Sequence, residues 1–291
     1  MAQDQPWLGG LLIVASAVAY SLAGFFTRLI ALDAWTLLFW RGVYGGLFIA
    51  AVMIWLERRD AIAAIRAIGR SGLVIAACST FATICFINAL ARTSVADVMV
   101  INATTPFFAA AIAWLWTGER ERTATLVASV AALFGVILTF DGALSGGRLF
   151  GNLLALVMTI LISLMMVIIR KRRDTPMLPA AALSAFAVAF LVAPVATPRA
   201  GLGENWIYLV LFGAAQFGLG LLLLTLGTRL ISATRSALVG SPETPLALLW
   251  VWLAFGEIPS LMTCVGGAVV MAAVVADMLI AARLNGAHEP G

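Results

Sequence analysis

The chain has 291 residues, of which 63% are hydrophobic and only 11% are charged, and its mean hydropathy is +1.05. This composition excludes an ordinary soluble domain and is typical of a protein embedded in a bilayer. The formal net charge of +4 does not require a nucleic-acid partner, because basic residues in a membrane protein set its orientation.

Apolar stretches long enough to cross a bilayer, about 20 residues each, follow one another with only short loops between them. The first stretch lacks a basic flank and is too long for a cleavable signal peptide. We therefore predict an all-α, multi-pass membrane protein without an appended soluble domain. Its ten transmembrane helices are expected at 7–27, 34–56, 71–91, 94–117, 123–140, 149–170, 177–197, 204–228, 232–255 and 259–282.

Lysine and arginine residues are divided unequally between the two sides of these helices. With the N-terminus in the cytoplasm, the outside loops carry only Arg28, Arg92, Arg148 and Arg199. The inside loops then carry a much larger set: Arg58, Arg59, Arg66, Arg70, Arg120, Arg122, Arg170, Lys171, Arg172, Arg173, Arg229, Arg235 and Arg283. The positive-inside rule therefore predicts that both termini face the cytoplasm, in a bacterial-type inner membrane.

Two pairs of segments resemble each other. Residues 90–117 and 228–255 each begin with a small-residue turn, carry a proline near the middle and are followed by Gly-Glu, and residues 9–28 match 151–170 at an offset of 142. A duplicated hydrophobic unit is typical of transporters that bind substrate between two repeats. Five spans per repeat is an odd number, so the second repeat must be inverted. We place the joint in the glycine-rich stretch 141–147, which gives repeats at 1–142 and 143–291.

Several short motifs occur in order along the two halves. They are Phe39-Trp40-Arg41, Asn88-Ala89-Leu90, Pro106 with Gly118-Glu119-Arg120, and Glu243 and Pro245 with Gly256-Glu257. Together with the five-plus-five hydropathy pattern, they resemble the EamA-type ten-helix carriers of the drug/metabolite transporter superfamily, over the whole chain. The resemblance implies a secondary transporter that works by alternating access. It also implies export of amino acids or similar small metabolites, as in the aromatic amino acid exporter subgroup.

Prolines at membrane depth predict interrupted helices. Each removes an N–H and frees the carbonyl four residues earlier, and such carbonyls are tolerated only where protein or a wet cavity receives them. We therefore expect Asn102, Thr105 and Ser241 to line a cavity between spans 1–4 and 6–9, with spans 5 and 10 at the periphery carrying few polar residues. A kink used only for helix packing is the alternative. The prolines concerned are Pro106, Pro242 and Pro245.

Two charged residues inside predicted spans are candidates for the substrate site. Glu243 is the only acid near the centre of any predicted span, and it could bind a substrate ammonium group, carry a coupling proton, or form a structural ion pair or hydrogen bond with Arg41 or Arg235. Arg41 could bind a carboxylate, or its side chain could reach the outer interface by snorkelling.

The remaining candidates for a substrate-binding lining are aromatic or weakly polar. Such a lining would suit apolar or aromatic amino acids, because rings stack on rings and methionine adapts to shape. The alternative for each is an ordinary lipid-facing or interfacial position. These candidates are Tyr20, Ser21, Trp40, Tyr44, Phe81, Thr83, Asn88, Ser163, Met166 and Gln216. Gly118 and Gly256 are expected to end helices, with Glu119 and Glu257 before the next helix N-termini.

Other classes of function find little support. The single histidine, His288, lies in the polar C-terminal tail, and the sequence offers no metal-ligand cluster, nucleophile–base pair or phosphate loop. We therefore predict no catalytic residue, metal or cofactor. A quaternary-cation multidrug exporter is the alternative, although its small four-helix relatives use an acid in the first helix and span 7–27 has none. The expected partners are the lipid bilayer and a small-molecule substrate, not nucleic acid, and the choice between monomer and homodimer stays open.

Overall fold

The computed structural model describes residues 6–30, 32–57, 66–90, 92–93, 95–118, 120–139, 149–172, 177–203, 206–256 and 261–286. The helices of the first half are α1 (Pro6–Ser21), α2 (Ala23–Leu29), α3 (Ala34–Glu57), α5 (Gly69–Leu90), α6 (Val95–Asn102), α7 (Thr105–Thr117) and α8 (Thr123–Thr139). Those of the second half are α9 (Leu149–Lys171), α10 (Met177–Val192), η2 (Pro198–Leu202), α11 (Trp206–Leu211), η3 (Phe212–Gly218), α12 (Leu219–Thr228), α13 (Ala233–Gly240), α14 (Glu243–Phe255) and α15 (Leu261–Gly286).

These helices form the ten predicted membrane segments, so the all-α membrane fold is confirmed. Within the described residues, seven segments are long and apolar enough to cross a bilayer, and shorter apolar helices make up the other three: Thr123–Leu138, Met177–Val192 and Cys264–Ile280. The seventh span, expected at 177–197, ends at Val192. Pro194 follows two residues later, and the residue before a proline is disfavoured in the helical conformation.

Two segments are interrupted at the predicted prolines. The fourth breaks between α6 and α7, with Pro106 in the first turn of α7, and the ninth breaks between α13 and α14 at Pro242. A hydroxyl compensates each break: Thr105 donates to the carbonyl of Asn102, and Ser241 donates to the carbonyl of Leu238 over 2.7 Å. Because these carbonyls are satisfied locally, the chain can be interrupted at membrane depth without an orphaned acceptor.

The C-terminal ends of these two broken segments match the expectation for glycine. Gly118 and Gly256 adopt the left-handed conformation, with φ of 69° and 72°, and their N–H groups donate to the carbonyls of Trp114 and Trp252. A left-handed residue after the last helical turn costs least for glycine, which has no Cβ. The structure does not describe Glu119, Glu257 or the predicted joint at 141–147, so the expected positions of the two acids before helix N-termini stay predictions.

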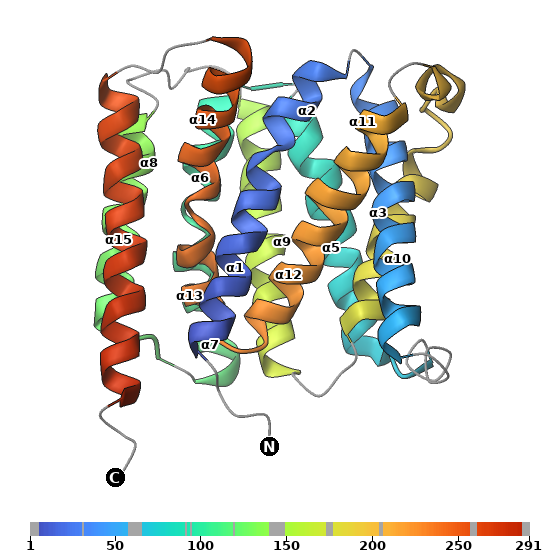
Figure 1. The fold of residues 1–291 in the computed structure, drawn as a ribbon. Helices are drawn as coiled ribbons and strands as arrows, with labels where there is room; N and C mark the ends of the chain where they lie inside the picture. Colours follow the sequence, from blue (N-terminus) through green and yellow to red (C-terminus); the bar gives the residue numbers. More distant parts are fainter. Residues whose placement is uncertain are drawn as a thin grey trace.

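The packing of the helices repeats between the two halves. Three contacts pair a helix of one half with a helix of the other: α3 with α10, α7 with α13, and α8 with α15. In addition, α1 packs against α12 in the same way as α5 packs against α9. Exchanging each helix for its counterpart leaves these contacts unchanged with one exception: the α7–α13 contact becomes α14–α6, because α7 corresponds to α14 and α13 to α6. In Figure 1, α1 rises from the end at which α9 finishes, so the two run in opposite directions. This arrangement is the one expected for inverted repeats.

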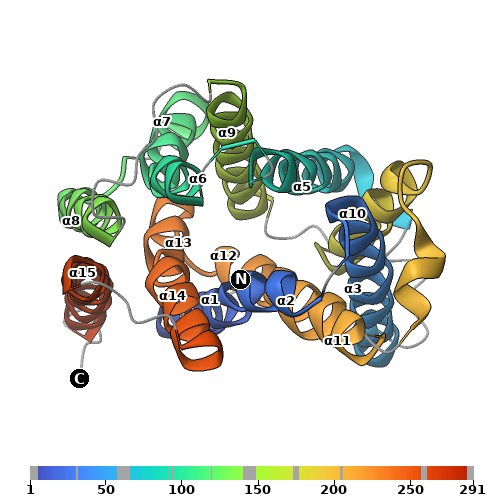
Figure 2. The same cartoon turned by 90° about the horizontal axis from the view of Figure 1, so that it is seen from above.

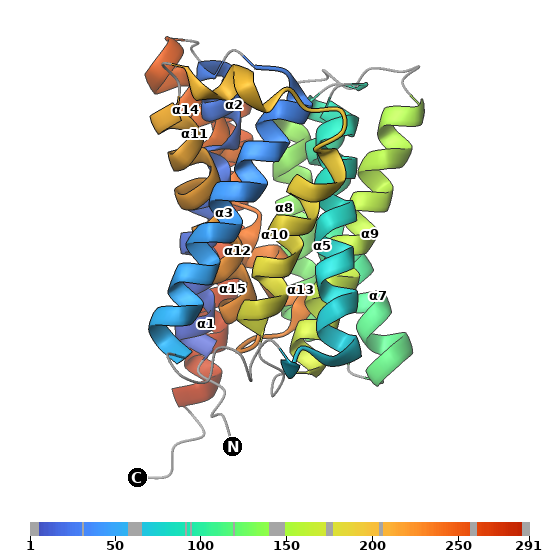
Figure 3. The ribbon, with the colours of Figure 1, turned by 90° about the vertical axis from the view of Figure 1, so that its right-hand side faces the viewer.

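The bundle differs between its two ends. Helices α7 and α13 pack together at the end where α1 begins and α15 finishes (Figures 1 and 3), whereas α6 and α14 diverge towards the opposite end (Figure 2). Helices α8 and α15 form a pair at one edge of the bundle (Figure 2). The two halves are therefore held together at one end and spread at the other, with the broken helices between them.

Candidate functional site

A cavity of about 170 Å³ lies where the interrupted helices meet. Residues of α1, α3, α5, α9, η3, α12 and the α6–α7 and α13–α14 breaks line it, while α8 contributes Val136. The seventh span, α10, packs behind α3 and α5 and supplies no lining residue within the described ranges. An apolar cavity of about 150 Å³ suffices for a benzene-sized molecule, so this one has room for a small metabolite.

Arg41 brings a buried positive charge to the cavity. Its side chain is only 5% exposed, so it does not reach the outer interface by snorkelling. Nε donates to the Gln216 amide oxygen over 3.1 Å, and Cζ lies 4.3 Å from the centre of the Phe217 ring and 5.3 Å from that of Phe212. Aromatic faces attract a guanidinium group electrostatically, so the cation is held by one hydrogen bond and two rings.

Glu243 brings a negative charge to the same cavity. It is the first residue of α14, where the helix dipole favours an acid. Within the described part of the chain, its carboxylate forms no ion pair with Arg41 or Arg235, since Arg235 pairs with Asp277 instead. The cavity thus contains an acidic and a basic side chain that form no ion pair with each other.

The rest of the lining is mostly apolar. It includes three methionines of α9, an aromatic ring of α5 and two aliphatic side chains of α12: Met158, Met165, Met166, Phe86, Leu221 and Leu224. Ser236 of α13 also lines the cavity, and its buried hydroxyl has no hydrogen-bond partner among the described residues. A hydroxyl left without a partner is a group that a bound solute can satisfy.

The structure brings together most of the predicted site residues. Those that line the cavity are Tyr20, Arg41, Thr83, Asn102, Thr105, Met166, Gln216, Ser241 and Glu243, with Pro106 beside them. The remainder lie outside the lining: Ser21, Trp40, Tyr44, Phe81, Asn88, Ser163, Pro242 and Pro245.

The side chains outside the lining have other contacts. Trp40 donates to the carbonyl of Pro198 and stacks on Tyr44 with ring centres 5.3 Å apart. Phe81 is 54% exposed on the outer surface of the bundle, and Ser21 accepts a hydrogen bond from the Trp250 indole over 2.8 Å. The sequence placed these residues within predicted membrane helices, but it did not show which side of each helix faces the cavity.

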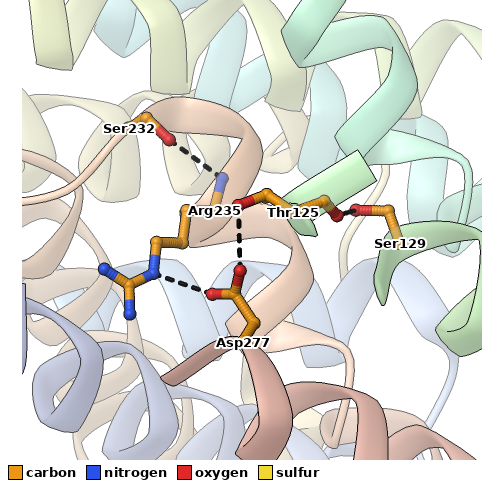
Figure 4. A network of polar contacts seen from close by, with 5 residues as sticks. All are labelled: Thr125, Ser129, Ser232, Arg235 and Asp277. Atoms are coloured by element: carbon orange, nitrogen blue, oxygen red, sulfur yellow. Dashed lines mark hydrogen bonds and ion pairs between the residues drawn. The ribbon is translucent and has the colours of Figure 1, made fainter. Parts of the chain in front are cut away.

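A second polar cluster lies outside the cavity, between α13 and the edge pair α8–α15 (Figure 4). Nε of Arg235 donates to one carboxylate oxygen of Asp277 over 2.8 Å, and the Thr125 hydroxyl donates to the other over 2.8 Å. Asp277 is 3% exposed and Arg235 12%. Asp277 is not among the site residues predicted from the sequence, because it lies near the end of a span that we expected to carry few polar residues.

An interrupted, internally duplicated helical bundle with a charged and apolar cavity at its centre is the architecture of a membrane transporter. The model of the EamA-like transporter family matches the chain twice, at residues 7–141 and 149–276. The chain therefore belongs to this family, whose members are secondary transporters and not enzymes. The substrate, the membrane and the subgroup are not specified by this membership.

The comparison with solved structures agrees on the fold. A structure titled "Crystal structure of protein" superposes with a TM-score of 0.78 at 19% sequence identity, covering 95% of this chain and 98% of that one. At this identity the likeness concerns the fold alone. No curated protein matches the chain significantly.

Proposed function

We propose that the chain exports amino acids or similar small zwitterionic metabolites, and that the central cavity is the substrate site. The observation that supports this proposal is the presence of Arg41 and Glu243 in one cavity without an ion pair between them. A zwitterion carries the complementary charges, so its carboxylate would bind Arg41 and its ammonium group would bind Glu243. Charges that face each other across a low-dielectric cavity interact more strongly than in water.

The apolar part of the lining supports a particular kind of side chain. Methionine side chains adapt to different shapes, and the Phe86 and Phe217 rings offer edges and faces for stacking. Apolar or aromatic amino acids fit this lining, as in the aromatic amino acid exporter subgroup that the sequence resembles. A lipophilic cation fits less well, because Arg41 would oppose its charge.

Alternating access follows from the difference between the two ends of the bundle. The packed pair α7–α13 would separate, and the diverging pair α6–α14 would approach, when the cavity changes sides. With both termini in the cytoplasm of a bacterial-type cell, the conformation described above is open towards the outside of the cytoplasmic membrane. The direction of net transport is then set by the substrate gradient or by a coupled ion.

Counterflow in proteoliposomes tests the proposal. Vesicles preloaded with unlabelled phenylalanine or leucine should accumulate the labelled amino acid, and a lipophilic cation such as tetraphenylphosphonium should not compete. A matched Ser184→Ala variant, changed at a buried hydroxyl of α10 outside the cavity lining, should transport normally. Accumulation of the labelled cation, without uptake of any amino acid, would favour the multidrug alternative and overturn this assignment.

One substitution can distinguish between two possible roles of Glu243, an anchor for the substrate ammonium group and a carrier of a coupling proton. As an ammonium anchor, Glu243→Gln should weaken substrate binding by about 1.5–3 kcal/mol, the range for a hydrogen bond to a charged group, in both exchange and net transport. If Glu243 instead carries a coupling proton, Glu243→Gln should abolish the response of transport to a pH gradient while exchange of substrate continues. We favour the anchor. An unchanged affinity together with an unchanged pH response would contradict both roles.

A further inference from the structure

Gln216 occupies an unusual place in the cavity wall. It lies in the π-helix η3, which is closed by a hydrogen bond from the Leu219 N–H to the Ala214 carbonyl, five residues earlier. Its side chain is fully buried. The amide oxygen accepts from Arg41 Nε over 3.1 Å, while the amide nitrogen donates to the Tyr20 carbonyl over 3.2 Å. One side chain therefore links α3, η3 and the end of α1.

These partners determine which way the amide points. Arg41 Nε can only donate and the Tyr20 carbonyl can only accept, so the opposite amide orientation would place two donors together and two acceptors together. Because both ends of the amide are used, Gln216 has little capacity left to bind a substrate directly. Its hydrogen bonds act on Arg41.

Close backbone contact brings η3 to this position. A Cβ added to Gly213 would lie 2.5 Å from the Tyr44 Cβ, and one added to Gly45 would lie 2.9 Å from the Gly213 carbonyl oxygen. Helices α3 and η3 therefore touch through glycines, one turn after Arg41 along α3. π-Turns in helices occur frequently at functional sites, and here the wide turn presents Gln216 to the guanidinium group.

The geometry leaves one edge of the guanidinium free. Nε is bonded to Gln216 and the ring of Phe217 covers a face, whereas Nη1 and Nη2 have no hydrogen-bond acceptor within the described part of the chain. Two parallel N–H groups at this edge match the two oxygens of a carboxylate.

We propose that Gln216 is a positioning residue that holds Arg41 so that Nη1 and Nη2 face the cavity and bind the substrate carboxylate end-on. This inference rests on the proposed function, since it names the group of the substrate that Arg41 recognises. Without Gln216, the guanidinium loses its only side-chain acceptor among the described residues and can rotate between the two phenylalanine rings. The affinity for a carboxylate then falls, while the affinity for the rest of the substrate does not.

Calorimetric binding to the purified protein in detergent tests the proposal with three ligands that differ in one charged group each. Phenylalanine carries both charges, 3-phenylpropionate lacks the ammonium group, and phenylalaninamide lacks the carboxylate. Gln216→Met has a similar length but cannot form the two hydrogen bonds. It should raise Kd for phenylalanine and 3-phenylpropionate about tenfold, the equivalent of one charge-assisted hydrogen bond, and leave Kd for phenylalaninamide within about twofold of the wild-type value.

Two further variants test the positioning role. Gln216→Glu keeps an acceptor for Arg41 but pairs with its charge and loses the donor to the Tyr20 carbonyl, so this variant should lose carboxylate affinity although Arg41 keeps an acceptor. In an Arg41→Met background, Gln216→Met should have no further effect on any Kd, because residues that act through each other are non-additive. The Ser184→Ala variant serves as the control in every measurement.

The outcomes distinguish the inference from the function on which it rests. If Arg41→Met weakens carboxylate ligands but Gln216→Met does not, the positioning role is wrong and the zwitterion site stands. If Gln216→Met weakens all three ligands equally, the residue supports the cavity in general and the inference is overturned. If Arg41→Met binds phenylalanine as tightly as the wild type, the proposed function itself fails.

Discussion

Replacing Asp277 by asparagine would measure how strongly α13 is tied to the edge pair α8–α15. The substitution keeps the shape of the side chain and an acceptor for the Thr125 hydroxyl, but it removes the charge that pairs with Arg235 over 2.8 Å. Both partners are nearly buried, at 3% and 12% exposure. The Arg235 guanidinium would therefore stay largely buried without a counter-charge.

The size of the effect follows from this burial. Removing one partner of a buried ion pair costs about 3–5 kcal/mol, because the other charge is left desolvated and unpaired. For a chain of this length, each kcal/mol shifts the thermal midpoint by about 2–4 °C. We therefore expect Asp277→Asn to lower Tm by on the order of 6–20 °C at a fixed scan rate. Replacing both partners by apolar residues, as in Arg235→Met with Asp277→Leu, should restore most of the loss.

In a background in which Cys85 and the exposed Cys264 are replaced by alanine, a thiol-reactive dye can follow unfolding, because the thiol of Cys78 is buried and becomes reactive when the bundle opens. Ser129→Ala is the matched control: it removes a hydroxyl that bonds only within its own helix, to the Thr125 carbonyl, and leaves the carboxylate contacts in place. A Tm for Asp277→Asn equal to that of the control would refute the reasoning. So would a double variant whose loss equals the sum of the two single losses.

Three further predictions concern the cavity, the helix contacts and the outer surface. Tryptophan at Asn102 or Ser241 should fill the cavity and abolish counterflow while the protein remains folded by the thiol assay; full activity in both variants would contradict the placement of the site. Gly45→Leu should lower Tm or prevent folding, because its side chain would meet the backbone of η3, and overpacking typically costs about 1–3 kcal/mol or more; a normal Tm and normal counterflow would show that the contact is loose. Asp33 caps α3 by accepting hydrogen bonds from the N–H groups of Trp35 and Thr36. Partial burial raises the pKa of its carboxyl group, but these hydrogen bonds and those of the Thr36 and Thr197 side chains outweigh that effect and hold the pKa below its usual value. Asp33→Ala should therefore lower the free energy of unfolding by about 0.5–2 kcal/mol at neutral pH. A lowered folded-state pKa stabilises the fold at pH values above the unfolded-state pKa of about 3.9. The difference in stability between wild type and Asp33→Ala should therefore shrink as pH falls through the folded-state pKa. A difference that stays constant down to strongly acid pH would refute the capping role of the Asp33 carboxylate.

The number of the membrane segments and most of their limits could be predicted from the sequence, because they depend on local properties. A run of apolar residues is long enough to span a bilayer or it is not, and proline interrupts a helix wherever it occurs in its interior. The breaks at Pro106 and Pro242 and the left-handed Gly118 and Gly256 follow from such local chemistry. The match between the two halves was also visible, because a duplicated unit keeps its landmarks in order.

The partners of the buried charges could be decided only by the tertiary structure. Arg41 bonds to Gln216, 175 residues away, and Arg235 pairs with Asp277 and not with Glu243. In a soluble helix, an apolar stripe shows which face is buried. In lipid, the outer face of a helix is as apolar as the inner one, so the pattern of hydrophobic residues carries little information about rotation. Which side chains share a cavity depends on how each helix is turned and packed against the others, and that is settled by contacts between residues far apart in the sequence.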